Sequence, residues 1–107
     1  MERLVFNKEQ HKFEELKEYG FAKRLEIGNN EDICTTYENI EWHFNVGDSG
    51  IEIHEQRKDN YWNYGFDIKE IHIWNDCESP VDKSVWLVLY DLIKDGLVVK
   101  ENQDVKD

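Results

Sequence analysis

Two histidines and two glutamates lie at alternating positions on either side of a turn-forming stretch. They are Glu41, His43, Glu52 and His54. If residues 47–50 form the loop of a β-hairpin, His43 faces His54 across the strands and the two glutamates lie diagonal to them. His43, His54 and Glu52 could then ligate zinc or another divalent ion. The same histidines could equally form a pH-sensitive spot, or be two exposed side chains on a solvated sheet face.

No other stretch predicts chemistry. Ser49 lies in a Gly-Asp-Ser-Gly string of the kind found around some serine nucleophiles, but a nucleophile also needs a base and oxyanion donors. No H-E-x-x-H or similar motif is present. Cys34 and Cys77 belong to no C-x-x-C pair, which favours two free thiols. We therefore expect no catalytic residue and no cofactor, and a protein that is not an enzyme.

Alternation of apolar and polar residues over 40–68 predicts an antiparallel meander. With Val46 opposite Ile51 and a second loop at 57–60, both hairpins place their aromatic residues on one face, and a one-residue slip would exchange the faces. The predicted buried face consists of Ile40, Trp42, Phe44, Val46, Ile51, Ile53, Tyr64, Phe66 and Ile68, with Trp62 at its margin. The predicted polar face consists of Glu41, His43, Asn45, Glu52, His54, Gln56, Asn63 and Asp67. A change of phase after Ile68 indicates a bulge or a change of direction at residues 69–70.

Helices are predicted before and after the strands. Asn7 is a suitable N-cap for a first helix, and Gly20 is suited to its end. Ser79 and Pro80 are typical of the start of a second helix that Gly96 would terminate. The apolar face of this second helix consists of Val85, Val88, Leu89, Leu92 and Ile93, flanked by Trp86 and Tyr90.

These elements predict one α+β domain over residues 1–107. It has an N-terminal helix, a hairpin at 22–37, a mainly antiparallel sheet of about five or six strands, and a C-terminal helix packed on the aromatic face. Residues 100–107 are expected to be a flexible polar tail. No apolar run approaches the roughly 20 residues that cross a bilayer, and no signal-peptide pattern is present, which favours a cytoplasmic protein.

Negative charge is concentrated in the middle of the chain. The net charge is −11, and residues 31–78 carry twelve acidic and three basic residues. This distribution argues against nucleic acid and anionic membranes as direct ligands, and it favours a basic protein partner or a cation. The predicted binding surface comprises Glu41, His43, Glu52, His54 and Asp67, with Trp62 as an aromatic anchor. Alternatively, the charge serves only solubility.

In size and in its richness in Asn, Lys, Glu and Ile, the chain resembles small acidic bacterial proteins of bacteriophages, prophages and toxin–immunity systems. Such proteins often bind and block a host or partner protein. The resemblance therefore implies a non-enzymatic, inhibitor-like module that presents an acidic sheet face to a basic partner, and it assigns no residue roles. The alternative is a metal-binding protein or metal-dependent enzyme that uses His43 and His54. Either a monomer or a homodimer is compatible with the sequence, since Trp86 and Tyr90 could join two copies.

Overall fold

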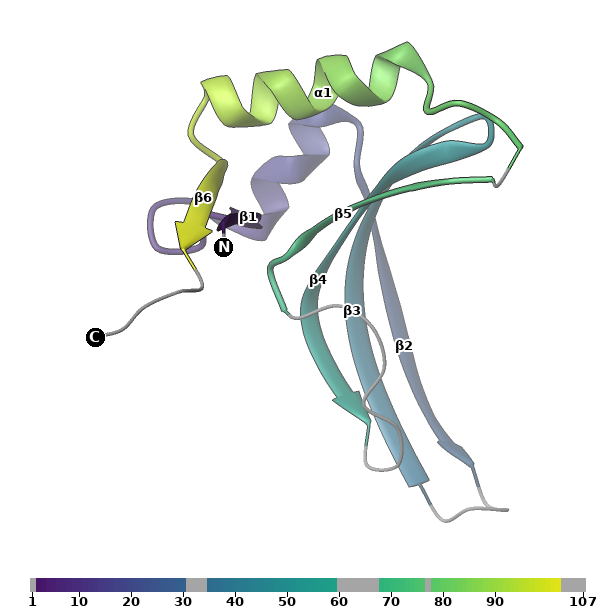
Figure 1. The fold of residues 1–107 in the computed structure, drawn as a ribbon. Coiled ribbons are helices and arrows are strands. Elements are labelled where there is room, and N and C mark those ends of the chain that lie inside the picture. The colour runs from purple at the N-terminus through teal and green to yellow at the C-terminus, as the bar shows by residue number, and fades with distance from the viewer. Residues whose placement is uncertain (1, 31–34, 60–67, 77, 103–107) are drawn as a thin grey trace.

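The computed structural model describes residues 2–30, 35–59, 68–76 and 78–102. The predicted α+β class and the C-terminal helix are confirmed, but six strands form two sheets and the predicted N-terminal helix is only a short 3-10 segment (Figure 1). In chain order the elements are β1 (Glu2–Phe6), the 3-10 helix η1 (Phe13–Tyr19), β2 (Ala22–Asn30), β3 (Thr35–Val46), β4 (Ser49–Asp59), β5 (Ile71–Asn75), α1 (Lys83–Lys94) and β6 (Val98–Asn102).

The larger sheet has the order β2-β3-β4-β5, and the smaller one pairs β1 with β6. All of these pairs are antiparallel. A bridge between Val5 and Glu70 joins the two sheets. The predicted change of direction before β5 is present, because Lys69 adopts a φ of 68°. Since β6 extends to Asn102, the predicted tail from residue 100 is wrong in its first part, and residues 103–107 lie outside the described chain.

The β3–β4 hairpin differs from the predicted register by two residues. Its loop is only Gly47 and Asp48, so Val46 lies opposite Ser49 and not opposite Ile51. Gly50 belongs to β4, and a Cβ at this position would overlap the backbone oxygen of Phe44. For residues 41–46 and 49–54, a shift of two residues leaves each side chain on its predicted face, since the side-chain period of a strand is two.

A β-bulge interrupts β4 at Glu55. Glu41 lies opposite His54, while Ile40 lies opposite Gln56, so one residue of β4 has no partner position on β3. The predicted register, with Val46 opposite Ile51, would place Gln56 opposite Glu41, and this pairing is wrong. Gln56 instead donates a hydrogen bond of 2.6 Å to Glu38. The bulge thus removes Gln56 from the predicted polar row.

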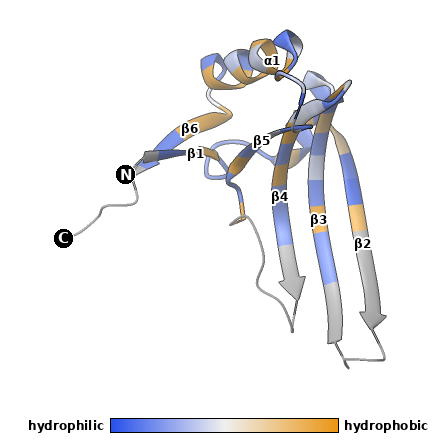
Figure 2. Cartoon of the chain, turned by 45° about the vertical axis from the view of Figure 1, so that its right-hand side comes forward, coloured by the Kyte–Doolittle hydropathy of each residue, from blue (hydrophilic) through white to orange (hydrophobic). Residues whose placement is uncertain are grey.

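α1 lies across one end of the larger sheet (Figure 2), and its buried residues pack with those of η1 against the aromatic face there. The buried residues of this face confirm part of the prediction: Trp42, Ile51 and Ile53 are fully buried, and they pack with Phe6, Phe13, Leu16, Phe21, Val85, Leu89 and Leu92. Ile40, Phe44 and Val46 are half-buried. Ile68 is 41% exposed, contrary to prediction. The predicted core positions Tyr64 and Phe66, the marginal Trp62, and the polar Asn63 and Asp67 lie outside the described residues.

The segment after β1 does not form the predicted helix, and Asn7 contacts the chain that follows α1. Its backbone N–H donates to Leu97 at 2.7 Å, and its side-chain amide donates to the carbonyl oxygen of Gly96 at 3.1 Å. Asn7 therefore ties β1 to the chain that follows α1 and does not cap a helix. The 3-10 helix begins only at Phe13, and it ends as predicted at Gly20, which has a φ of 94°.

The C-terminal helix starts later than its sequence indicated. Asp82, not Ser79, is the N-cap, and its carboxylate accepts a hydrogen bond of 2.8 Å from the N–H of Ser84. The predicted end at Gly96 is confirmed by its φ of 85°. Ile93, expected in the buried face, is exposed. Among the described residues, no helix has the length and hydropathy needed to cross a membrane.

Candidate functional site

Four side chains meet on the polar face of the larger sheet. Glu41 and His43 are two residues apart on β3, and Glu52 and His54 are two residues apart on β4. The structure brings together all four predicted residues but changes their partners: His43 lies opposite Glu52, and Glu41 lies opposite His54. The predicted pairing of His43 with His54 is therefore wrong. We call these residues the His–Glu cluster.

Each carboxylate of the His–Glu cluster lies between the two imidazoles. Glu52 places Oε2 at 2.6 Å from Nε2 of His54 and Oε1 at 3.8 Å from Nδ1 of His43. Glu41 places Oε1 at 3.2 Å from Nε2 of His43 and Oε2 at 3.6 Å from Nε2 of His54. Each glutamate thus turns one oxygen toward each histidine, and the short His54–Glu52 contact is the strongest hydrogen bond of the group.

The His–Glu cluster is largely withdrawn from solvent. His54 is 5% exposed, and the side chains of Glu41 and His43 are 14% and 16% exposed. The hydrogen bond to His54, and then the charges of His54, His43 and His72, lower the pKa of Glu52, while burial acts in the opposite direction. The carboxylate of Glu52 is therefore held in its charged form by the imidazoles around it.

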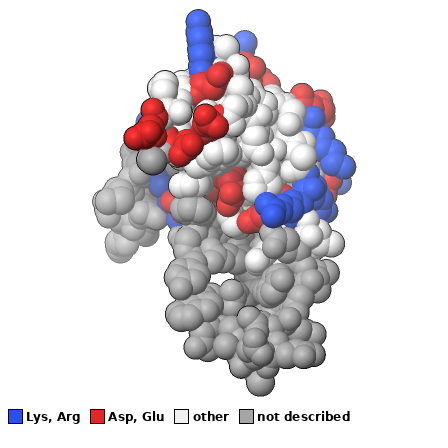
Figure 3. All heavy atoms as spheres, turned by 90° about the vertical axis from the view of Figure 1, so that its right-hand side faces the viewer, with Lys and Arg blue, Asp and Glu red and all other residues white. Residues whose placement is uncertain are grey.

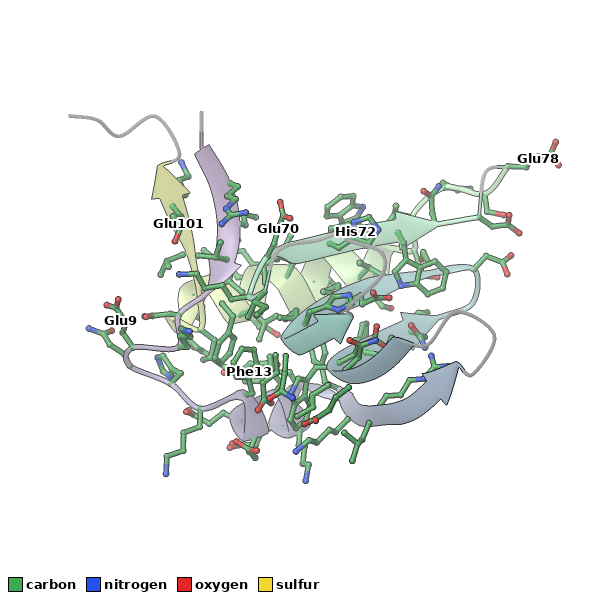
Figure 4. The ribbon with its side chains drawn as sticks, turned by 90° about the horizontal axis from the view of Figure 1, so that it is seen from below. Glu9, Phe13, Glu70, His72, Glu78 and Glu101 are labelled. Atoms are coloured by element: carbon green, nitrogen blue, oxygen red, sulfur yellow. The ribbon has the colours of Figure 1, made fainter. Side chains whose placement is uncertain are left out.

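Two neighbouring strands complete the surroundings of the cluster. On β5, His72 lies directly opposite Glu52, and Figure 4 shows the position of His72 on this strand from below. On β2, Arg24 lies opposite Glu41 and Ala22 lies opposite His43. His72 was not among the predicted site residues. Only the pairing of β5 with β4 brings His72 beside the cluster. Its position between Ile71 and Ile73 was the available signal that it lies on the polar face of the sheet.

This arrangement changes the prediction of an acidic surface on the sheet. Glu41 and Glu52 point at imidazoles and are mostly buried, so they present little charge to a partner. Asp67 and Trp62, the other predicted contacts, lie outside the described residues.

A different group of acidic residues is open to solvent at one end of the molecule. It comprises Asp48 in the β3–β4 turn, Asp76 and Glu78 after β5, and Asp82 at the start of α1, all exposed. We call it the acidic corner. The N–H of Asp76 donates to the carbonyl oxygen of Asp48 at 2.7 Å, and the N–H of Asp82 donates to the hydroxyl of Ser49 at 2.8 Å. These backbone contacts gather the acidic side chains on one face (Figure 3).

The outer side of α1 carries an uncovered apolar stripe. Its members are Trp86, Leu87, Tyr90 and Ile93, which are 50%, 55%, 61% and 45% exposed. Successive helical residues are rotated by about 100°, so these four share one side of α1 while Val85, Leu89 and Leu92 face the core. We call this set the α1 stripe. Sequence reading noted Trp86 and Tyr90 but missed Leu87 and misplaced Ile93.

Comparison with known proteins supplies no functional assignment. No protein-family model matches the chain, and neither a curated protein nor a solved structure matches it.

Proposed function

We propose that the protein is a non-enzymatic module that binds a basic protein partner through the α1 stripe and the acidic corner. The observation that carries the proposal is the exposure of four large apolar side chains on one side of a single helix. Contiguous exposed apolar surface on a small domain is typical of interaction sites. Tryptophan and tyrosine are also the residues that most often dominate binding energy.

Charge around the α1 stripe supports a basic partner. The acidic corner lies at the N-terminal end of α1, and Asp82 is one turn before Trp86. At the other end, Glu18, Asp91 and Asp95 are close enough to act together on the pKa of Tyr19. Lys83 and Lys94 are the basic residues of α1 itself, so acidic groups outnumber basic ones around the stripe. An apolar strip flanked by lysines or arginines is the complementary surface, and a basic amphipathic helix is its simplest form.

The same charges disfavour a second copy as the occupant. Two copies pairing through antiparallel α1 helices would bring the acidic corner of one copy against Asp91 and Asp95 of the other. Two copies pairing through parallel helices would bring the two acidic corners together. Repulsion between like charges across an interface opposes both arrangements. A module that covers a basic surface of another protein acts by blocking it, so inhibition is the expected consequence.

A fluorescently labelled amphipathic helical peptide, with leucine residues on one face and lysine residues on the other, is a direct probe. Fluorescence anisotropy should show that it binds at least about 10-fold more tightly than a matched leucine–glutamate peptide, and that added salt weakens it. The double variant W86A/Y90A should bind the lysine peptide at least about 10-fold more weakly than the wild type does, as expected for aromatic hot spots. L25A is the matched control, because Leu25 is 56% exposed but lies on β2.

Three results would overturn the proposal. The lysine and glutamate peptides could bind equally, L25A could weaken binding as much as W86A/Y90A, or no binding could be seen at low salt. Analytical ultracentrifugation gives a separate check. A dimer that W86A/Y90A dissociates would assign the α1 stripe to a second copy of the chain.

A further inference from the structure

We propose that Glu41, Glu52 and His54 bind one divalent transition-metal ion, with His43 as a positioning residue. This inference is independent of the proposed partner surface, because the α1 stripe lies on the opposite side of the sheet from the His–Glu cluster. Among the described residues, these three side chains offer one ligand atom each, all within 4.8 Å of one another. The ligands come from adjacent strands, whose backbone pairing holds their Cα positions.

Ligand spacing fits a small ion. Zinc is bound at about 2.0–2.2 Å by imidazole nitrogen and carboxylate oxygen, so two ligands of a tetrahedral ion are about 3.3–3.6 Å apart. From Nε2 of His54, the Oε2 atoms of Glu52 and Glu41 lie at 2.6 and 3.6 Å. Rotation about the terminal torsion of Glu52 adjusts the shorter distance, since this torsion is broad in carboxylates. The ion would occupy the place where His54 and Glu52 now share a hydrogen bond.

Charge balance favours a divalent cation. Two carboxylates of low exposure carry two negative charges, and a divalent ion with a neutral imidazole neutralises both. Arg24 on β2 and His72 on β5 face the glutamates from the adjacent strands and reduce part of this charge. Neither lies in the set of three close ligand atoms.

His43 is placed to orient both carboxylates and not to complete the ligand set. It lies near Oε1 of each glutamate, at 3.2 Å from Glu41 and 3.8 Å from Glu52, while the Oε2 atoms face His54. A group that binds the outer oxygen of a ligating carboxylate fixes its direction, and loss of such a group typically weakens metal binding about 10–100-fold. The geometry thus gives His43 a role distinct from that of His54.

The donor set defines the class of metal. One imidazole nitrogen with two carboxylate oxygens suits a first-row ion such as Zn²⁺ or Mn²⁺. Ca²⁺ takes six to eight oxygen ligands, and Mg²⁺ keeps most of its water, so neither is matched by this set. Three protein ligands leave a coordination position for water or for a group from outside the chain.

Isothermal titration of tag-free, chelator-treated and dialysed protein tests the site with ZnCl2 and, separately, MnCl2. We expect one ion per chain for at least one of the two metals, and no comparable binding of MgCl2. E41Q, E52Q and H54Q should each weaken binding by more than about 100-fold, and H43Q by about 10–100-fold. H11Q is the control, because His11 also contacts a carboxylate, that of Glu15 at 3.1 Å, but does not belong to the His–Glu cluster, so this variant should bind as the wild type does.

Co²⁺ absorption separates ligands from the positioning residue. H43Q should keep the wild-type band shape at saturating Co²⁺, whereas H54Q should change it, since only His54 donates nitrogen to the ion. The proposal is overturned if wild-type protein binds neither Zn²⁺ nor Mn²⁺ at millimolar concentration, or if H11Q weakens binding as much as E41Q. Circular dichroism and thermal melting identify variants that fail to fold, and the result with wild-type protein does not depend on any variant. W86A/Y90A should bind metal normally, which separates failure of this site from failure of the partner surface.

Discussion

The indole N–H of Trp42 donates a hydrogen bond of 2.9 Å to the carboxylate of Glu55. Trp42 is fully buried in the core, and Glu55 is the extra residue of the β4 bulge. The bulge therefore aims a carboxylate at the one polar atom of the largest core side chain. Without the bulge, the register of the hairpin would place Glu55 opposite Ile40.

Removal of this acceptor should destabilise the protein. We expect E55A to lower the free energy of unfolding by about 1–3 kcal/mol, because a buried N–H loses its partner. E55Q keeps an acceptor oxygen and should cost less. Urea denaturation measures both, with E9A at an exposed position as the control, expected within about 0.5 kcal/mol of wild type. Equal effects of E55A and E9A would contradict the role assigned to Glu55.

Two glycines of the β3–β4 hairpin should respond differently to alanine. At Gly50 a Cβ meets the Phe44 backbone oxygen and the Trp74 ring, so G50A should cost about 1–3 kcal/mol or more. At Gly47 no atom lies within 4 Å of a new Cβ, and only its φ of 57° opposes alanine, at about 1–2 kcal/mol. Thermal melting of the two variants compares them. A better tolerated G50A than G47A would favour the four-residue loop over the two-residue turn.

Tyr19 on η1 donates a hydrogen bond of 2.6 Å to Asp95 after α1. This bond, then burial, and then the charge of Asp95 raise the pKa of Tyr19 to about 12. A raised pKa means that the neutral phenol stabilises the fold below about pH 10, and that this contribution is lost as the pH rises toward 12. Comparison with Y19F identifies the part of the tyrosinate absorbance that comes from Tyr19. This absorbance should titrate with a pKa near 12 in the wild type and closer to 10 in D95N. Identical titrations of wild type and D95N would show that the two side chains are not coupled.

Glu101 on β6 binds Arg3 on β1 and Lys69 in the turn before β5. Hydrogen bonds from Lys69, at 2.9 Å, and Arg3, at 2.8 Å, lower the pKa of this carboxyl. A lowered pKa means that its contribution to stability is present above the unfolded value, near 4.5, and is lost as the pH falls through the folded value. The melting temperature of E101Q should therefore lie below that of wild type at pH 7, and the difference should shrink below about pH 4.5. A difference that stays constant down to pH 3 would exclude this linkage.

The sequence determined which face of the sheet is occupied by the residues of 41–54 that pair across the β3–β4 hairpin. Alternation with a period of two assigns Trp42, Ile51 and Ile53 to the core and the His–Glu cluster to the other side, and an error of two residues in register does not alter that assignment. The sequence also determined where η1 and α1 terminate, because Gly20 and Gly96, which follow them, adopt a positive φ that other residues avoid.

Tertiary contacts decided the rest. Residues 47–50 are all turn formers, so the local sequence does not choose between a two-residue and a four-residue loop. In the structure Gly50 lies in β4 close to Phe44 and Trp74, and a glutamate lies opposite each histidine. Asn7 could cap a helix, but the chain after α1 offers its amide a carbonyl partner, which no local pattern encodes. The exposure of the α1 stripe also could not be predicted from the sequence. α1 is apolar on nearly all sides, and only packing decides which of its apolar residues are covered.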